Sequence, residues 1–232
     1  MARRSSAVLV ALLAAGCASG HPKVDAHPVP THASPSAAAR SNTAADARLS
    51  RLLIRASDLP VGYTKDTQAR GATLAVSPTD SACARRFAEV TRLSTVGVLA
   101  PMARARASFT KTGGQSFLRV AAFRYRDAQA ATKVVDAVHG VLAGCRKFTA
   151  TDPSSKRVVN VSLSPLPFPH LGEGGVATDG ALTSAAQHVY VDMVFVRTAA
   201  SIAYVTGLTT GQRDFVALKR AARAEVKRLG TG

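Results

Sequence analysis

Three cysteines carry the clearest chemical signals in the chain. Cys17 directly follows the small residues at positions 14–16, at the end of an apolar run near the N-terminus. Cys83 and Cys145 lie within segments whose apolar residues recur at helical spacing. A thiol can be acylated, oxidised to a disulfide or used as a nucleophile, and the choice depends on the compartment. The compartment therefore has to be inferred first.

The N-terminus has the features of an export signal. Arg3 and Arg4 precede an apolar run, residues 7–15, which is too short to span a bilayer comfortably. The following Leu13-Ala14-Ala15-Gly16-Cys17 resembles the lipobox of bacterial lipoproteins, which implies cleavage before Cys17 and attachment of a diacylglyceryl group to its thiol. Acyl chains contribute about 0.8 kcal/mol per buried methylene. We therefore expect a signal peptide over residues 1–16 and a lipid-anchored protein on the extracytoplasmic face of the cell membrane; the alternative is a plain secretory signal in which Cys17 is incidental.

In an exported protein the two remaining cysteines are expected to pair, because thiols are oxidised there and even numbers combine. A bond between Cys83 and Cys145 would close a loop of about 62 residues and stabilise the fold by about 4 kcal/mol on the chain-entropy model. The alternative is a redox-active pair. It lacks the short Cys-x-x-Cys spacing that tunes thiolate chemistry.

Motifs for catalysis and metal binding are weak. Ser108-Phe109-Thr110-Lys111-Thr112-Gly113 overlaps two motifs of penicillin-binding enzymes, but its residues alternate as in a strand, whereas the nucleophile and lysine need helical spacing. The other candidate is an acid/base arrangement of His188 and Asp192 with His139 or His170. The alternative is that His188 and Asp192 simply belong to a solvated face of the sheet. The histidines before residue 45 lack partners at metal-ligand spacing. We expect a protein that is not an enzyme and uses no cofactor or metal.

Charge is the main feature of the composition. The chain has 232 residues with 30 Lys and Arg against 14 Asp and Glu, a formal net charge of +16. An exported protein rarely meets nucleic acid, so we expect no nucleic-acid partner and instead contact with anionic lipid headgroups or wall polymers.

Residues 17–45 are rich in Pro, Ala and Ser and predict a disordered tether. Residues 46–232 predict one domain.

Hydrophobic periodicity predicts helices interleaved with hairpins. Helices are expected at 47–56, 81–93, 127–145 and 212–229, and strands at 63–68, 105–109, 116–126, 159–163, 189–195 and 202–208. The glycines at 113 and 114 and the residues at 198–201 are expected to turn two hairpins. Hairpins rather than crossovers indicate an α+β fold, an antiparallel sheet with helices packed on one face.

The domain as a whole resembles the sensor-domain lipoproteins of actinobacteria, which are similar to the extracellular sensor domains of membrane Ser/Thr protein kinases. The resemblance covers about residues 46 to 230 and is carried by 52–63 (LLIRASDLPVGY), a cysteine in the next helix, 144–148 (GCRKF) and 194–197 (VFVR). It implies an α+β domain with a large cleft for an unidentified ligand, and the pairing of Cys83 with Cys145.

The leading hypothesis is therefore a non-enzymatic, membrane-anchored binding or sensor domain for a lipid or cell-wall precursor. Aromatic residues on strands are candidates to line its concave face, with arginines as partners of an anionic headgroup; the candidates are Phe117, Phe123, Tyr125, Tyr190, Tyr204, Arg124 and Arg197. For the aromatics the alternative is an ordinary core role. The alternative for the protein is a structural or interaction lipoprotein that binds an anionic envelope polymer or a partner protein through its basic surface.

Overall fold

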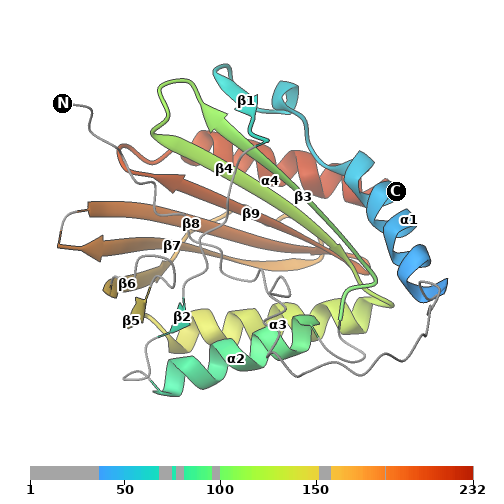
Figure 1. Cartoon of the computed structure of the whole chain (residues 1–232), viewed down its shortest axis with the longest axis horizontal. Helices are drawn as coiled ribbons and strands as arrows, with labels where there is room; N and C mark the ends of the chain where they lie inside the picture. Colours follow the sequence, from blue (N-terminus) through green and yellow to red (C-terminus); the bar gives the residue numbers. More distant parts are fainter. Residues whose placement is uncertain are drawn as a thin grey trace, which may run out of the picture.

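A single antiparallel sheet organises the described part of the chain (Figure 1). The computed structural model describes residues 37–67, 75–76, 81–95, 100–151, 158–185 and 187–231. Within them, nine strands lie in the order β1-β3-β4-β9-β8-β7-β6-β5-β2. Their bounds are β1 Tyr63–Lys65, β2 Ala75–Val76, β3 Ala103–Lys111, β4 Ser116–Arg124, β5 Lys147–Thr151, β6 Val158–Pro165, β7 Gly174–Ser184, β8 Gln187–Thr198 and β9 Ser201–Thr209.

Within the described residues four α-helices cover this sheet, on both of its faces, and a short 3-10 helix η1 (Ala56–Asp58) follows α1. Helices α1 (Ala37–Leu52) and α4 (Phe215–Gly230) share one apolar core with the sheet. Helices α2 (Ser81–Thr95) and α3 (Ala128–Gly144) share a second core on the opposite face. The α+β class and the antiparallel sheet are thus confirmed, whereas the expectation that the helices pack on one face is corrected.

The central strands explain why two helix layers form. In β8, Met193 and Phe195 belong to the α2–α3 core, while Val194 and Val196 belong to the α1–α4 core. All six residues at the start of β9 are buried. A strand that is apolar on both faces needs a cover on each side, because each exposed face would leave large side chains in water.

Several local predictions are confirmed. Strands β3 and β4 form a hairpin whose turn contains Gly113 and Gly114, both with positive φ. Strands β8 and β9 pair around Ala199 and Ala200. The side chain of Asp127 accepts a hydrogen bond from the Ala130 N–H and begins α3.

Helix α1 begins at Ala37, ten residues before its predicted start. The stretch 37–45, expected within the tether, is therefore helical. Alanines dominate its sequence, and alanine has the best intrinsic helix propensity. The signal peptide, Cys17 and the tether up to residue 36 lie outside the described residues.

The predicted disulfide is present between Cys83 on α2 and Cys145 at the end of α3. Both cysteines are buried, and Phe87 and Phe148 pack beside them with ring centroids 5.2 Å apart. The bond therefore joins the two helices of this layer at their shared apolar surface.

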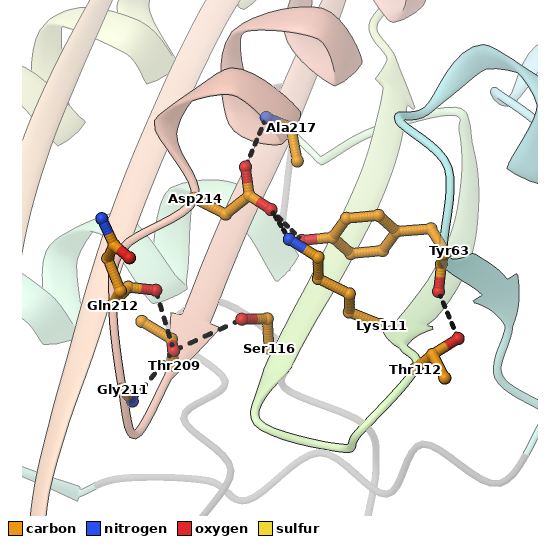
Figure 2. Close-up of polar contacts among 10 residues, drawn as sticks. Tyr63, Lys111, Thr112, Ser116, Thr209, Gly211, Gln212, Asp214 and Ala217 are labelled. Atoms are coloured by element: carbon orange, nitrogen blue, oxygen red, sulfur yellow. Dashed lines mark hydrogen bonds and ion pairs between the residues drawn. The ribbon is translucent and has the colours of Figure 1, made fainter.

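A polar cluster ties the other layer to the edge of the sheet (Figure 2). Asp214 accepts hydrogen bonds from the Ala217 N–H at 3.0 Å, from Lys111 Nζ at 2.7 Å and from the Tyr63 hydroxyl at 3.2 Å. Burial tends to raise the pKa of Asp214, but the bonds from Lys111 and Ala217 outweigh it and the pKa lies below its usual value. The cluster fixes the start of α4 against β1 and β3.

Candidate functional site: an arginine face on the sheet

Three arginines project from β3 and β4 on the α2–α3 side of the sheet. Strand register places Arg106 opposite Ala121, and Arg119 opposite Ser108. Ala121 belongs to the α2–α3 core, and side chains of paired residues share a face. Arg104, two residues before Arg106, lies on the same face. We call Arg104, Arg106 and Arg119 the arginine face.

Two of these arginines are held close to one another. Arg106 and Arg119 are diagonal neighbours across the β3–β4 pair, a position within reach of long side chains. Burial together with the like charges of Arg119 and Arg104 lowers the pKa of Arg106. Burial also lowers the pKa of Arg119. The arrangement therefore concentrates positive charge on one face of the sheet.

None of the three guanidinium groups has a carboxylate within ion-pairing distance among the described residues. Other arginines of the described chain do find such partners. Arg213 contacts Asp179 at 2.9 Å, and Arg228 contacts Asp58 at 2.8 Å. Like charges brought close together repel one another, and a bound anion would relieve that repulsion.

Aromatic residues border the arginine face. Tyr204 on β9 pairs with Ala121, which puts its ring beside Arg106 and Arg119, and it stacks on Phe195 with ring centroids 4.3 Å apart. Tyr125 follows β4, is buried and interacts electrostatically with Arg104. Phe117 and Phe123 lie on the same face and are half-buried. Guanidinium groups and aromatic rings are therefore neighbours on this face of the sheet.

The helices of the described chain pack mainly elsewhere on this side. Helix α3 lies over β6 to β9, and α2 packs on α3. Helix α1 covers β3 and β4 from the opposite face. Consistent with this, Arg104 and Arg106 are exposed and Arg119 is half-buried. Arg104 and Arg106 can therefore be reached by a ligand from the α2–α3 side of the sheet.

The four ligand-binding residues predicted from the sequence do not come together. Tyr125 adjoins the arginine face, but Arg124 points to the other side of the sheet, where its Nη1 donates to Ser201 at 3.0 Å. Tyr190 also lies on that other side, with the Arg213 guanidinium 4.4 Å from its ring centroid. Arg197 shares the α2–α3 side and forms an ion pair with Glu173, so its charge is already partnered.

The catalytic arrangements weighed from the sequence are also separated. Ser108 and Lys111 lie on opposite faces of β3, and Lys111 is bound to Asp214. His188 contacts Thr183 and Tyr190, whereas Asp192 is buried beside Arg213, with burial raising its pKa to about 6. These pairs therefore do not form the acid/base sets considered above.

His139 and His170 line a different hollow. Its volume is about 450 Å³, and it lies between α3, the segment 166–173 and the start of β7. The hollow contains Glu173, which accepts hydrogen bonds from Arg197 and from the Ala199 N–H.

Within the described residues, no group of three His, Cys, Asp or Glu side chains is placed to hold a metal ion. None of the described helices is long and apolar enough to cross a membrane.

Sequence reasoning missed the arginine face. Arg104 and Arg106 were visible as the polar side of the strand at 105–109, but Arg119 had no signal of its own. Only the β3–β4 register identifies the residues of β4 that share a face with Arg106. Arg124, the predicted residue on this strand, lies an odd number of positions from Arg119 and therefore on the other face.

Comparison with known proteins identifies a structural relative. No family model matches the sequence, and no curated protein matches it. Among solved structures, the fold is similar to the extracellular domain of PknH from Mycobacterium tuberculosis, with a TM-score of 0.58 and 13% sequence identity. The match covers 80% of this chain and 96% of that one. At this identity the likeness shows a shared fold.

Proposed function

We propose that this protein is an extracytoplasmic lipoprotein, anchored through a diacylglyceryl group on Cys17, whose domain binds an anionic ligand without catalysing a reaction. The ligand is a lipid or a cell-wall precursor, with a phosphate or carboxylate group on the arginine face and an apolar part against the bordering aromatic rings. The fold fits this proposal, because the solved structure it resembles is an extracellular domain.

The observation that carries the proposal is the adjacent pair of guanidinium groups of Arg106 and Arg119, neither of which has an ion-pair partner among the described residues. A guanidinium presents its N–H donors as a planar fork that matches the oxygens of phosphate or carboxylate. Two forks on neighbouring strands favour a group with several oxygens. An anion there would relieve the repulsion between the arginines and satisfy their donors.

The half-buried rings of Phe117 and Phe123 support the amphipathic part of the proposal, because they share the face of the arginines and keep some exposed surface. Tyr204 is buried and stacked on Phe195, so it belongs to the packed layer beneath the arginines. Exposed aromatic surface next to a cationic group is the combination that a ligand with an anionic head and an apolar body requires.

Native mass spectrometry of residues 18–232, exported so that the disulfide forms, tests this proposal. The wild-type domain is expected to carry a co-purifying mass that denaturation releases and that contains phosphate or carboxylate. The double variant Arg106→Gln with Arg119→Gln is expected to lose it. The matched control Arg85→Gln with Arg146→Gln removes the same charge from the α2–α3 layer and is expected to retain it.

Two results would contradict the proposal. One is a wild-type protein that stays free of adduct and also fails to bind added anionic lipids or phosphorylated precursors. The other is equal loss of the adduct in the two double variants, which would show that overall charge rather than the arginine face holds it.

A structural or interaction lipoprotein that binds an anionic envelope polymer is the second candidate. The exposure of Arg104 and Arg106 favours it, and so does the excess of basic residues, which stays large after removal of Arg3 and Arg4 with the expected signal peptide. Polymer binding through surface charge is expected to weaken steeply with salt and to fall in proportion to the charges removed, whichever face they come from. Binding of a discrete ligand is instead expected to fall only when residues of the arginine face are substituted.

A further inference from the structure

A stripe of basic residues lies on the outer side of α4. Arg220, Arg223 and Lys227 follow Val216 at spacings of four, three and four residues, so the four side chains share one side of the helix. All four are exposed, and Val216 is 70% exposed. The residues that α4 buries, which include Ala217, Ala221 and Leu229, lie on its opposite side.

Helix α1 adds to the same side of the molecule. Its Leu49 is buried in the α1–α4 core, while Arg48 and Arg51 are exposed. Because α1 and α4 cover one face of the sheet, their exposed sides both point away from it (Figure 1). We call Arg48, Arg51, Val216, Arg220, Arg223 and Lys227 the helix-layer surface.

The acidic groups of these helices and of the turn between α1 and β1 are already engaged. Asp58 pairs with Arg228, and Glu225 is buried. The side chain of Asp46 accepts a hydrogen bond from the backbone N–H of Arg104. Within the described residues, none of the basic side chains of the helix-layer surface has an ion-pair partner. The surface therefore presents uncompensated positive charge.

We infer that the helix-layer surface docks on an anionic phospholipid bilayer. Each Lys or Arg near an anionic membrane strengthens binding about fivefold, so five such residues together make a strong attraction at low salt. The exposed Val216 stands beside Arg220 and can enter the headgroup boundary, as apolar residues of interfacial helices do. No described helix needs to cross the bilayer for this contact.

The position of α1 in the chain allows this orientation without requiring it. Its first residue, Ala37, follows Cys17 by twenty residues, and a chain of that length spans at most about 70 Å. The length of this segment matters only if Cys17 is the proposed anchor, whereas the charge of the helix-layer surface is independent of the anchor. Docking through α1 and α4 would turn the arginine face away from the bilayer, because the two surfaces lie on opposite sides of the sheet.

Sedimentation with vesicles tests the inference. Residues 18–232, which keep every described residue and lack the acyl chains, are mixed with vesicles of phosphatidylcholine containing phosphatidylglycerol, or of phosphatidylcholine alone. Wild-type protein is expected to bind only the anionic vesicles. The triple variant Arg220→Gln, Arg223→Gln and Lys227→Gln is expected to bind them about a hundredfold more weakly.

The control removes the same charge from the opposite layer, as Arg85→Gln, Lys133→Gln and Arg146→Gln, and is expected to bind nearly as well as wild type. Circular dichroism and the intact disulfide verify that both triple variants are folded. Equal weakening in the two variants, or no weakening in the helix-layer variant, would overturn the inference. The adduct measured by mass spectrometry depends on Arg106 and Arg119, so the two proposals can fail independently.

Discussion

The Ile54 backbone N–H donates a hydrogen bond to Glu225 Oε2 at 3.0 Å, and this carboxyl group is fully buried. Its other oxygen, Oε1, has no hydrogen-bond partner within the described structure. Burial raises the pKa of Glu225 to about 7. The contact joins α4 to the segment that follows α1, so a titratable group sits inside the α1–α4 layer.

Stability is expected to fall as the pH rises through this pKa. An ordinary glutamate has a pKa of 4.5, so between about pH 4.5 and 7 the folded protein binds more protons than the unfolded chain. Over that range the free energy of unfolding should decrease by about 3 kcal/mol and then level off. Urea unfolding followed by circular dichroism, at a series of pH values from 5 to 8, measures the change.

The Glu225→Gln variant should flatten most of that pH dependence. Asp192 contributes in the same direction, because burial raises its pKa to about 6, although Arg213 opposes the shift. Asp192→Asn is therefore expected to remove the smaller remaining part. If Glu225→Gln and wild type showed the same slope against pH, the buried carboxyl group would not be the source.

Loss of the disulfide is expected to destabilise the domain by about 4 kcal/mol, because the bond closes a loop between positions 83 and 145. The comparison is urea unfolding of wild type and of the double variant Cys83→Ala with Cys145→Ala. Adding a reductant should lower the stability of wild type to that of the variant and leave the variant unchanged. A reductant effect on the variant itself would point to another cause.

Asp214→Ala is expected to cost about 2 to 3 kcal/mol of stability, because it removes a helix cap and leaves the Tyr63 hydroxyl without its acceptor. Asp127→Ala is the matched control, since Asp127 caps α3 and, among the described residues, its carboxylate otherwise contacts the neighbouring Arg126. It should cost about 1 kcal/mol. Chemical denaturation of both variants tests this; equal losses would mean that the contacts of Asp214 beyond the cap contribute nothing.

Arg106→Gln is expected to stabilise the ligand-free protein slightly, by about 0.5 kcal/mol, because it removes repulsion from Arg104 and Arg119. The same substitution should weaken binding of an anionic ligand. A binding residue commonly shows this opposition between stability and function. Thermal unfolding with and without the ligand measures both effects, and a destabilised ligand-free variant would indicate a structural role for Arg106.

Cys17→Ser should release the exported protein from the membrane fraction into solution, because the acyl chains can no longer be attached. Fractionation in buffers of low and high salt measures this. Residual binding of the variant at low salt is expected through the helix-layer surface and should be lost at high salt. A wild-type protein that high salt alone extracts from membranes would contradict lipid attachment.

Strong periodicity made parts of this fold predictable. Helix α3 has six buried residues on one side and a clear cap at Asp127, and the β3–β4 hairpin alternates around two glycines. Strands β5 and β7 were not predicted. β7 contains Gly174, Gly175 and Gly180, which contribute no side chain to an alternating pattern. Its place in the sheet comes from pairing with β6 and β8, a tertiary interaction.

The candidate site was less accessible to prediction than the fold. The class of residue, arginine beside aromatic rings, was anticipated, and Tyr125 does adjoin the arginine face. The particular arginines could not be predicted. An alternating strand pattern shows that the strand has two faces, but it does not show which face a helix covers. The second helix layer was missed for the same reason.

The alternation along β4 also determines where this protein can change in length. Leu118 and Val120 are buried behind Arg119 in the α1–α4 core, so inserting one residue within β4 would exchange the two faces, exposing the leucine and burying the charge. Insertions at Gly113 and Gly114, where the turn is exposed, leave the pairing intact. Homologues are therefore expected to vary the turn and to keep the spacing from Arg119 to Phe123 constant, because the packing behind the arginine face enforces it.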